Sequence, residues 1–107
     1  VPLSAKPVVS AADAIKAARG LGVLTGRAEV CGEDVEPLTT KIGRMFSYVT
    51  ANDQDSSKAL AAFKAAHVRG IKEQTAKSKE TCGQVLRDFR QHPSRVGAFH
   101  RYISRFL

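Results

Sequence analysis

Apolar side chains recur at steps of three and four along most of this chain, which is the spacing of one face of an α-helix. The first run predicts a helix over about residues 10–31, where Ser10 followed by Asp13 forms a capping-box pattern. Cys31 closes this apolar stripe, and Gly32 is suited to end the helix. The stripe consists of Ala14, Ala17, Leu21, Leu24, Ala28 and Cys31.

Glycines interrupt the same run at residues 20–26, and each glycine inside a helix costs about 1 kcal/mol relative to alanine. Gly22 and Gly26 are four residues apart, so they share a helix face. Two interpretations stay open. Either the glycines let a second helix approach closely, or the helix is kinked there.

A second helix is predicted over about residues 35–51. Pro37 suits a first helical turn, and the carboxylates within residues 33–36 favour the positive end of a helix dipole. That role is sufficient to explain the paired acidic residues of this stretch. The apolar positions are Val35, Leu38, Ile42, Met45, Phe46 and Val49. Residues 51–57 are then predicted to form a loop that ends in good N-cap residues.

The third helical run covers about residues 56–91, where Pro93 stops it. Its apolar positions near the start are Leu60, Phe63, His67 and Ile71, and those near the end are Cys82, Val85, Leu86 and Phe89. Between them, residues 72–81 hold only Ala76 as an apolar residue. One rod of this length would extend about 54 Å, far beyond the two preceding helices. The helix must therefore project from the bundle or break, either at Gly70 or in the polar stretch.

A last, short amphipathic helix is predicted over about residues 94–106, with apolar positions at Val96, Phe99, Ile103 and Phe106. Pro2 and Pro7 disfavour a helix at the start, so residues 1–9 are predicted to form an extended arm. The fold class is therefore all-α, with residues 10–107 forming one domain, a small bundle of three to four helices.

The two cysteines of the chain, Cys31 and Cys82, both lie on predicted apolar faces. Neither belongs to a CxxC motif and no histidine stands at a ligand spacing, which argues against structural zinc and attached heme. A Cys31–Cys82 disulfide is the favoured interpretation, and two buried free thiols are the alternative. In straight antiparallel helices Cys31 would lie level with about residue 76, roughly 9 Å from residue 82. A disulfide therefore implies a kink in the third helix, a tilt of that helix or a shifted loop.

Charge is unevenly distributed. The chain has 17 basic and 10 acidic residues, a net charge of +7, and the excess lies in residues 57–107. This distribution permits contact with another protein, anionic lipid or nucleic acid, although charged helix faces also serve only to keep a protein soluble. The residues of a possible partner or anion-binding surface are Arg87, Arg90, Arg95, Phe99, Arg101, Tyr102 and Arg105. For residues 94–106 we favour a fourth core helix over such a binding surface.

No sequence motif indicates catalysis or a cofactor. Residues 20–26 read GxGxxxG rather than the dinucleotide-binding GxGxxG, and no strand precedes them. His67 with Met45 opposite could ligate heme or a metal, but we favour a partly buried histidine with a backbone or hydroxyl partner. No catalytic residue, metal site or cofactor is expected.

Location and function follow from these features as expectations. No apolar run reaches the roughly 18–20 residues that span a bilayer. The chain starts at Val1 without a signal-peptide pattern, which fits either a processed, exported protein or an artificially shortened chain. Of these we expect an exported, periplasmic or extracellular protein in its mature form. The leading hypothesis is a non-catalytic protein that binds another protein, such as a chaperone, inhibitor, immunity protein or secretion accessory. The alternative is a basic module that binds a membrane or nucleic acid through residues 57–107, and an enzymatic or cofactor-carrying bundle is the least favoured.

Overall fold

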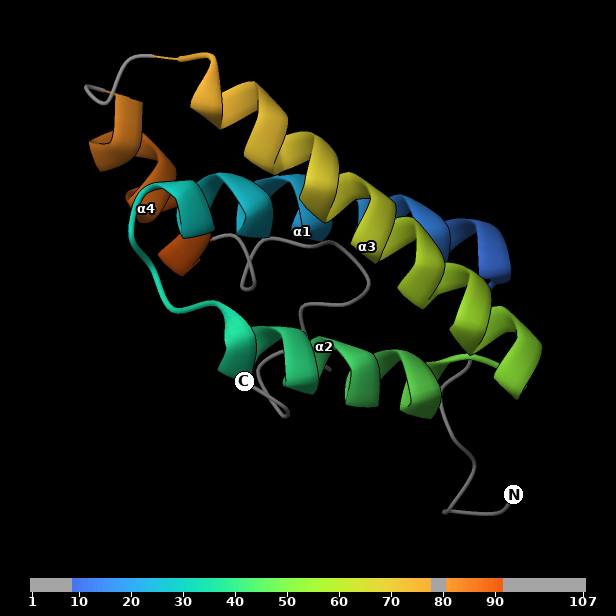
Figure 1. The fold of residues 1–107 in the computed structure, drawn as a ribbon. Coiled ribbons are helices and arrows are strands. Elements are labelled where there is room, and N and C mark those ends of the chain that lie inside the picture. The colour runs from blue at the N-terminus through green and yellow to red at the C-terminus, as the bar shows by residue number, and fades with distance from the viewer. Residues whose placement is uncertain (1–8, 78–80, 92–107) are drawn as a thin grey trace.

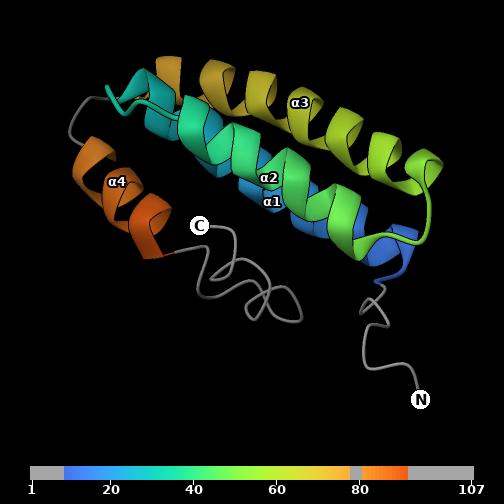
Figure 2. The ribbon, with the colours of Figure 1, turned by 90° about the horizontal axis from the view of Figure 1, so that it is seen from below.

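The computed structural model describes residues 9–77 and 81–91, and within them the chain is helical, without strands. The four helices are α1 (Ala11–Val30), α2 (Glu36–Val49), α3 (Asp53–Thr75) and α4 (Cys82–Gln91). α1 and α3 lie side by side and run in the same direction, whereas α2 returns in the opposite direction (Figure 1). α4 lies beside the C-terminal end of α1 and runs in a different direction (Figures 1 and 2). The predicted all-α bundle is confirmed.

α1 and α3 contact each other through their backbones. A Cβ atom on Gly22 would lie 2.5 Å from the carbonyl oxygen of Phe63, and one on Gly26 would overlap the carbonyl oxygen of His67. A Cβ on Gly70 of α3 would likewise overlap the backbone of α1. These three positions therefore admit only glycine without a shift of the helices. Of the two interpretations left open for Gly22 and Gly26, the structure shows the close approach, and α1 continues through both glycines as one helix.

α2 packs against this pair through large side chains. The central core joins α1, α2 and α3, and Phe46 and Phe63 are its largest members. Its buried residues are Val9, Ala14, Ala18, Leu21, Ile42, Met45, Phe46, Val49, Ala59 and Phe63. Large residues from α2, together with Leu21 of α1 and Phe63 of α3, thus fill the core around the small residues of α1 and α3.

The corner between α1 and α2 begins at a defined helix end. Gly32 has a φ of 95°, a left-handed conformation that favours glycine. Its N–H donates to the Glu29 carbonyl at 3.0 Å, and the N–H of Glu33 donates to the Ala28 carbonyl at 3.0 Å. These two bonds are those of a Schellman motif, with Cys31 as the C-cap. The chain therefore reverses immediately after the cysteine.

α3 differs from the predicted third helix at both ends. It begins at Asp53 rather than near residue 56, because the Asn52 side chain caps it by accepting the Asp55 N–H at 2.8 Å. It ends at Thr75, and α4 starts at Cys82, so the predicted helix over residues 56–91 is two helices. The break falls in the polar stretch and not at Gly70, which is part of the seam with α1.

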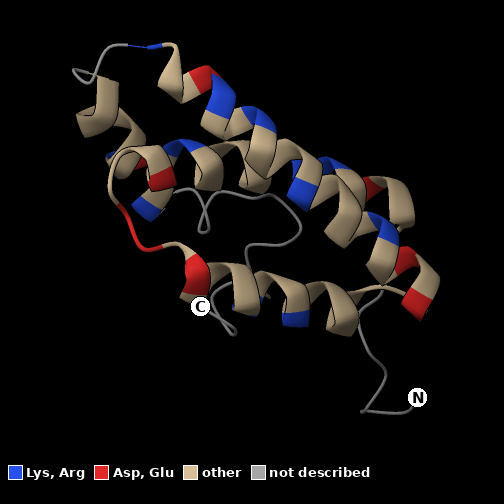
Figure 3. Ribbon diagram, viewed as in Figure 1, with Lys and Arg blue, Asp and Glu red and all other residues tan. Residues whose placement is uncertain are grey.

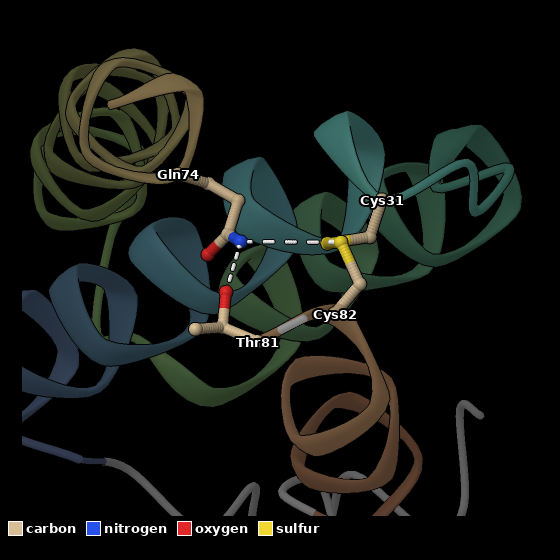
Figure 4. The surroundings of a disulfide bond; sticks show 4 residues. All are labelled: Cys31, Gln74, Thr81 and Cys82. Carbon is tan, nitrogen blue, oxygen red and sulfur yellow. Dashed lines mark hydrogen bonds between the residues drawn. A yellow bond between two sulfur atoms is a disulfide. The ribbon is translucent and has the colours of Figure 1, made fainter. Parts of the chain in front are cut away.

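The predicted disulfide is present, with a Cα–Cα distance of 5.4 Å between Cys31 and Cys82. Because Gly26 lies against the α3 segment that includes Gly70, Cys31 comes level with the end of α3, and a new helix has to bring Cys82 to it. Gln74 bridges the break, since its Nε2 donates to Thr81 Oγ1 at 2.6 Å and lies 3.9 Å from Cys82 Sγ (Figure 4). The predicted disulfide and the predicted break are thus confirmed together.

α4 has its own small core at the corner, separate from the central one. Its buried members are Ala28, Val35 and Val85, and the partly buried residues packed against them are Leu24, Cys31, Leu86 and Phe89. Three apolar positions predicted for this part of the chain, Val85, Leu86 and Phe89, belong to this small core. The predicted arm, apart from Val9, and the predicted helix over residues 94–106 lie outside the described residues.

The buried face of α3 differs from the predicted one. Its members are Ala59, Phe63, Ala66, Gly70 and Gln74, whereas Leu60, His67 and Ile71 are only partly buried. The prediction was right for Phe63 but wrong for His67 and Ile71, because it followed the largest apolar side chains. The small side chains face α1, since they alone permit the close contact of the two backbones.

Candidate functional site

A groove of about 460 Å³ lies between α2 and α3 and ends at the turn that follows α1. We call it the corner groove, and it is lined by residues 29, 33–36, 39, 40, 63, 64, 67 and 68. The last turn of α1, the α1–α2 connection, the first turns of α2 and the middle of α3 each contribute to it. The Schellman turn at Gly32 brings these elements together, because it directs the chain from α1 into α2.

The groove has an apolar part. Val35 and Phe63 are buried, with 5% and 1% of their surface exposed, and they form part of the lining. Val68 of α3 is 51% exposed and lines the same groove. Within the described residues, Val30 is the only other large hydrophobic side chain that is exposed. Val68 therefore offers apolar surface to solvent at the groove.

The polar part of the lining is mainly acidic. It contains the carboxylates Glu29, Glu33, Asp34 and Glu36, against the cations Lys64 and, when protonated, His67. Figure 3 shows this acidic segment where α1 passes into α2, on a chain whose net charge is +7. The corner groove is thus a local region of negative potential on a basic protein.

His67 and Glu29 connect α3 to α1 at the edge of the groove. His67 Nε2 lies 3.0 Å from Glu29 Oε2, and the His67 ring packs near Phe63 with centroids 6.2 Å apart. The predicted backbone or hydroxyl partner of His67 is therefore wrong, since its partner is a carboxylate. Met45 lies in the central core and is not part of the groove lining.

Metal binding can be assessed for the described part of the chain. Within residues 9–77 and 81–91, no group of three or more His, Cys, Asp or Glu side chains lies close enough to hold a metal ion.

The other polar groups of the groove mostly accept hydrogen bonds. The Thr39 and Thr40 hydroxyls donate to the carbonyls of Val35 and Glu36, at 3.0 and 3.2 Å, which leaves their lone pairs as acceptors. Asp34 Oδ1 accepts the N–H of Glu36 at 3.2 Å. Among the described residues, no cation forms an ion pair with the carboxylates at 33, 34 and 36. The groove therefore presents an excess of acceptors.

The structure places only part of the basic surface predicted from the sequence. Arg87 and Arg90 are exposed on α4, outside the groove, and Arg87 donates to Gln84 Oε1 at 2.8 Å. The other proposed members, Arg95, Phe99, Arg101, Tyr102 and Arg105, lie outside the described residues. Binding of an anionic surface through residues 57–107 therefore stays a prediction.

Sequence reasoning missed the groove. The carboxylates of residues 33–36 were visible, but a helix start was sufficient to explain them. Glu29 and Val68 carried no signal of their own, and Phe63 was predicted only as an apolar core position, because their shared location depends on how α1 and α3 pack.

Comparisons of the chain with protein-family models, with curated proteins and with solved structures found no match. None of the described helices is long and apolar enough to cross a membrane.

Proposed function

We propose that this chain is a non-catalytic binding protein and that a segment of another protein binds in the corner groove. The observation that carries the proposal is the exposed Val68 beside the buried Val35 and Phe63, in a hollow rimmed by polar groups. An apolar centre with a polar rim is typical of the surfaces by which proteins recognise one another.

The proposed location is an oxidising compartment outside the cytoplasm, periplasmic or extracellular. The Cys31–Cys82 disulfide supports this location, because structural disulfides persist in exported proteins and are rare in the cytosol. The same bond supports the groove mechanically. Cys31 is the C-cap of α1, and the acidic connection to α2 follows it directly.

Site-specific photo-cross-linking tests the proposal. A photoreactive side chain in place of Val68 should give a discrete heavier adduct in the native exported fraction, because residue 68 lines the groove. Mass spectrometry of the adduct should then identify a peptide from one partner protein.

The same probe at Ala65 is the matched control, since Ala65 is exposed on α3 and does not line the groove. Equal adducts from residues 65 and 68 would show non-specific contact and would contradict the proposal. Absence of an adduct from residue 68 would contradict it as well.

A further inference from the structure

We infer that the corner groove binds a cationic side chain, arginine or lysine, presented beside an apolar side chain on a polypeptide segment. This inference rests on the proposed function, because it names the chemistry of the partner that the groove receives. It is carried by the charges, the hydrogen-bonding groups and the apolar surface of one groove.

The charge of the groove opposes that of the whole chain. Four of the ten carboxylates of the chain line it, whereas the chain as a whole carries a net charge of +7. A cationic ligand is repelled by the rest of such a surface and attracted at the groove. Generic electrostatic attraction therefore cannot account for binding of a cation to this protein, and local recognition is needed.

Three of these carboxylates have no cationic partner in the described part of the chain. By contrast, Glu29 pairs with His67, and Glu73 pairs with Arg27 at 2.6 Å. The first turn of α2 offsets little of the remaining charge, because a helix N-terminus carries only about half a positive charge. Glu33, Asp34 and Glu36 therefore leave the corner with an uncompensated negative charge.

The hydrogen-bonding groups favour the same class of ligand. The carboxylates of the corner and the lone pairs of Thr39 and Thr40 are acceptors, since both hydroxyl protons are already donated to backbone carbonyls. A guanidinium has five N–H donors and no acceptor, and an ammonium has three donors. A donor-rich cation therefore matches the groove, whereas an anionic or acceptor-rich ligand does not.

The apolar part of the groove sets the orientation of the ligand. Val68 is exposed on α3, and Lys64 lies one turn before it on the same helix. Lys64 repels a cation from this side, so the cation is directed to residues 33–36 at the start of α2. The neighbouring apolar side chain of the ligand then packs against Val68.

Fluorescence anisotropy with labelled short peptides tests this assignment on the full disulfide-bonded chain. The probe carries one Arg–Leu pair in a Gly/Ser background, and the matched peptides carry Gln–Leu and Arg–Ser. Saturable binding of the Arg–Leu peptide, weakened by salt and by each replacement, is the expected result. Failure to bind, or equal binding of the Gln–Leu peptide, would overturn the inference.

Two variants separate local recognition from net charge. The double variant Glu33→Gln/Asp34→Asn should weaken binding roughly fivefold, because exposed ion pairs contribute modestly, and it retains Oδ1 as an acceptor at residue 34. The matched control Asp13→Asn/Asp88→Asn changes the net charge equally, at exposed positions outside the groove, and should bind as the native chain does. Equal losses in both variants would overturn the inference.

A further substitution tests the apolar contact. Val68→Ser should weaken binding of the Arg–Leu peptide and leave binding of the Arg–Ser peptide unchanged. Equal effects on the two peptides would overturn the proposed orientation.

Competition with a small molecule tests whether the ligand is a polypeptide. Spermine is cationic but has no apolar side group, so it should compete only weakly with the Arg–Leu peptide. Competition at the peptide's own concentration range, lost in Glu33→Gln/Asp34→Asn, would assign the groove to small polyamines instead.

The failure of this inference is distinguishable from that of the proposed function. Cross-linking at residue 68 whose yield is undiminished in Glu33→Gln/Asp34→Asn would reject the cationic ligand and retain protein binding in the groove. Absence of any adduct from residue 68 in the otherwise native chain would reject both this inference and the proposed function.

Discussion

Arg27 of α1 and Glu73 of α3 form a charged pair that connects the two helices. The Arg27 guanidinium donates to Glu73 Oε2 at 2.6 Å. This hydrogen bond lowers the pKa of the Glu73 carboxyl below its usual value of 4.5, and partial desolvation acts in the opposite direction. The folded state therefore binds this proton less readily than the unfolded state does.

Glu73→Gln should alter the pH dependence of stability. Because the folded pKa of Glu73 is lowered, its contribution is present at neutral pH and is lost as the pH falls through the folded pKa. Urea unfolding should show the native chain more stable than the variant at neutral pH, with the difference disappearing in acid. The effect should be small, since solvent reaches both side chains of the pair and screens their attraction.

The control is Arg27→Gln, which should return the Glu73 pKa, measured by NMR, toward its usual value. An unchanged Glu73 pKa in that variant would contradict the assigned cause.

At the scale of helices, the seam between α1 and α3 decides the arrangement of the bundle. Three glycines allow backbone contact, and Gly22 and Gly26 of α1 share one helix face. Gly43 of α2 is different, because the nearest atom to a Cβ there is Leu60 Cδ1 at 4.0 Å. The chain thus contains helical glycines that packing requires and at least one that it does not.

Alanine substitutions at Gly26 and Gly43 should change the free energy of unfolding in opposite directions. Gly26→Ala should destabilise by about 1–3 kcal/mol, because its Cβ would overlap the backbone of α3. Gly43→Ala should stabilise by up to about 1 kcal/mol, because alanine loses less backbone entropy in a helix and meets no close neighbour. Denaturant unfolding of both variants measures the difference, and a stabilising Gly26→Ala would disprove the backbone seam.

At the scale of the whole molecule, two clusters of buried side chains are joined by one disulfide. The central core joins α1, α2 and α3, whereas the smaller cluster joins α4 to the corner. α4 has only ten residues, which is too short for a helix to be stable by itself in water. Its position therefore depends on the Val85 contacts and on the Cys31–Cys82 bond.

Removal of the disulfide should act unevenly on the molecule. Cys31→Ser/Cys82→Ser should lower the free energy of unfolding by about 4 kcal/mol, as expected from the entropy of closing a loop of this size. Hydrogen exchange should accelerate most in α4, while the amides of the α1–α3 seam keep the larger part of their protection. Equal acceleration in α3 and α4 would show that the two clusters unfold as one.

Much of the fold could be predicted because it depends on neighbours along the chain. Ser10 caps α1 by accepting the Asp13 N–H at 3.1 Å, and Gly32 ends it through a left-handed turn. Pro37 lies in the first turn of α2, where it was expected. The disulfide was favoured from the number and positions of the cysteines, and the length of the third helical run indicated that it projects or breaks, and both features can be read from the sequence alone.

Burial on α3 could not be predicted in the same way. Gln74 lies in a stretch that was predicted to be a polar gap, yet only 2% of its surface is exposed. Its amide donates to Thr81 across the helix break, a contact that exists only in the folded chain. Polarity in the sequence therefore did not indicate exposure here.

The sequence by itself determined the helical class, the Ser10 cap of α1 and its end at Gly32, and it favoured the Cys31–Cys82 disulfide together with a third helix that projects or breaks. The tertiary structure alone decided which face of α3 is buried and that Glu29, Val68 and residues 33–36 line one groove. The physical reason is that caps and periodicity act between residues a few positions apart. The groove and the buried face instead depend on how closely two helix backbones approach, and that distance is set by packing between residues far apart in the sequence.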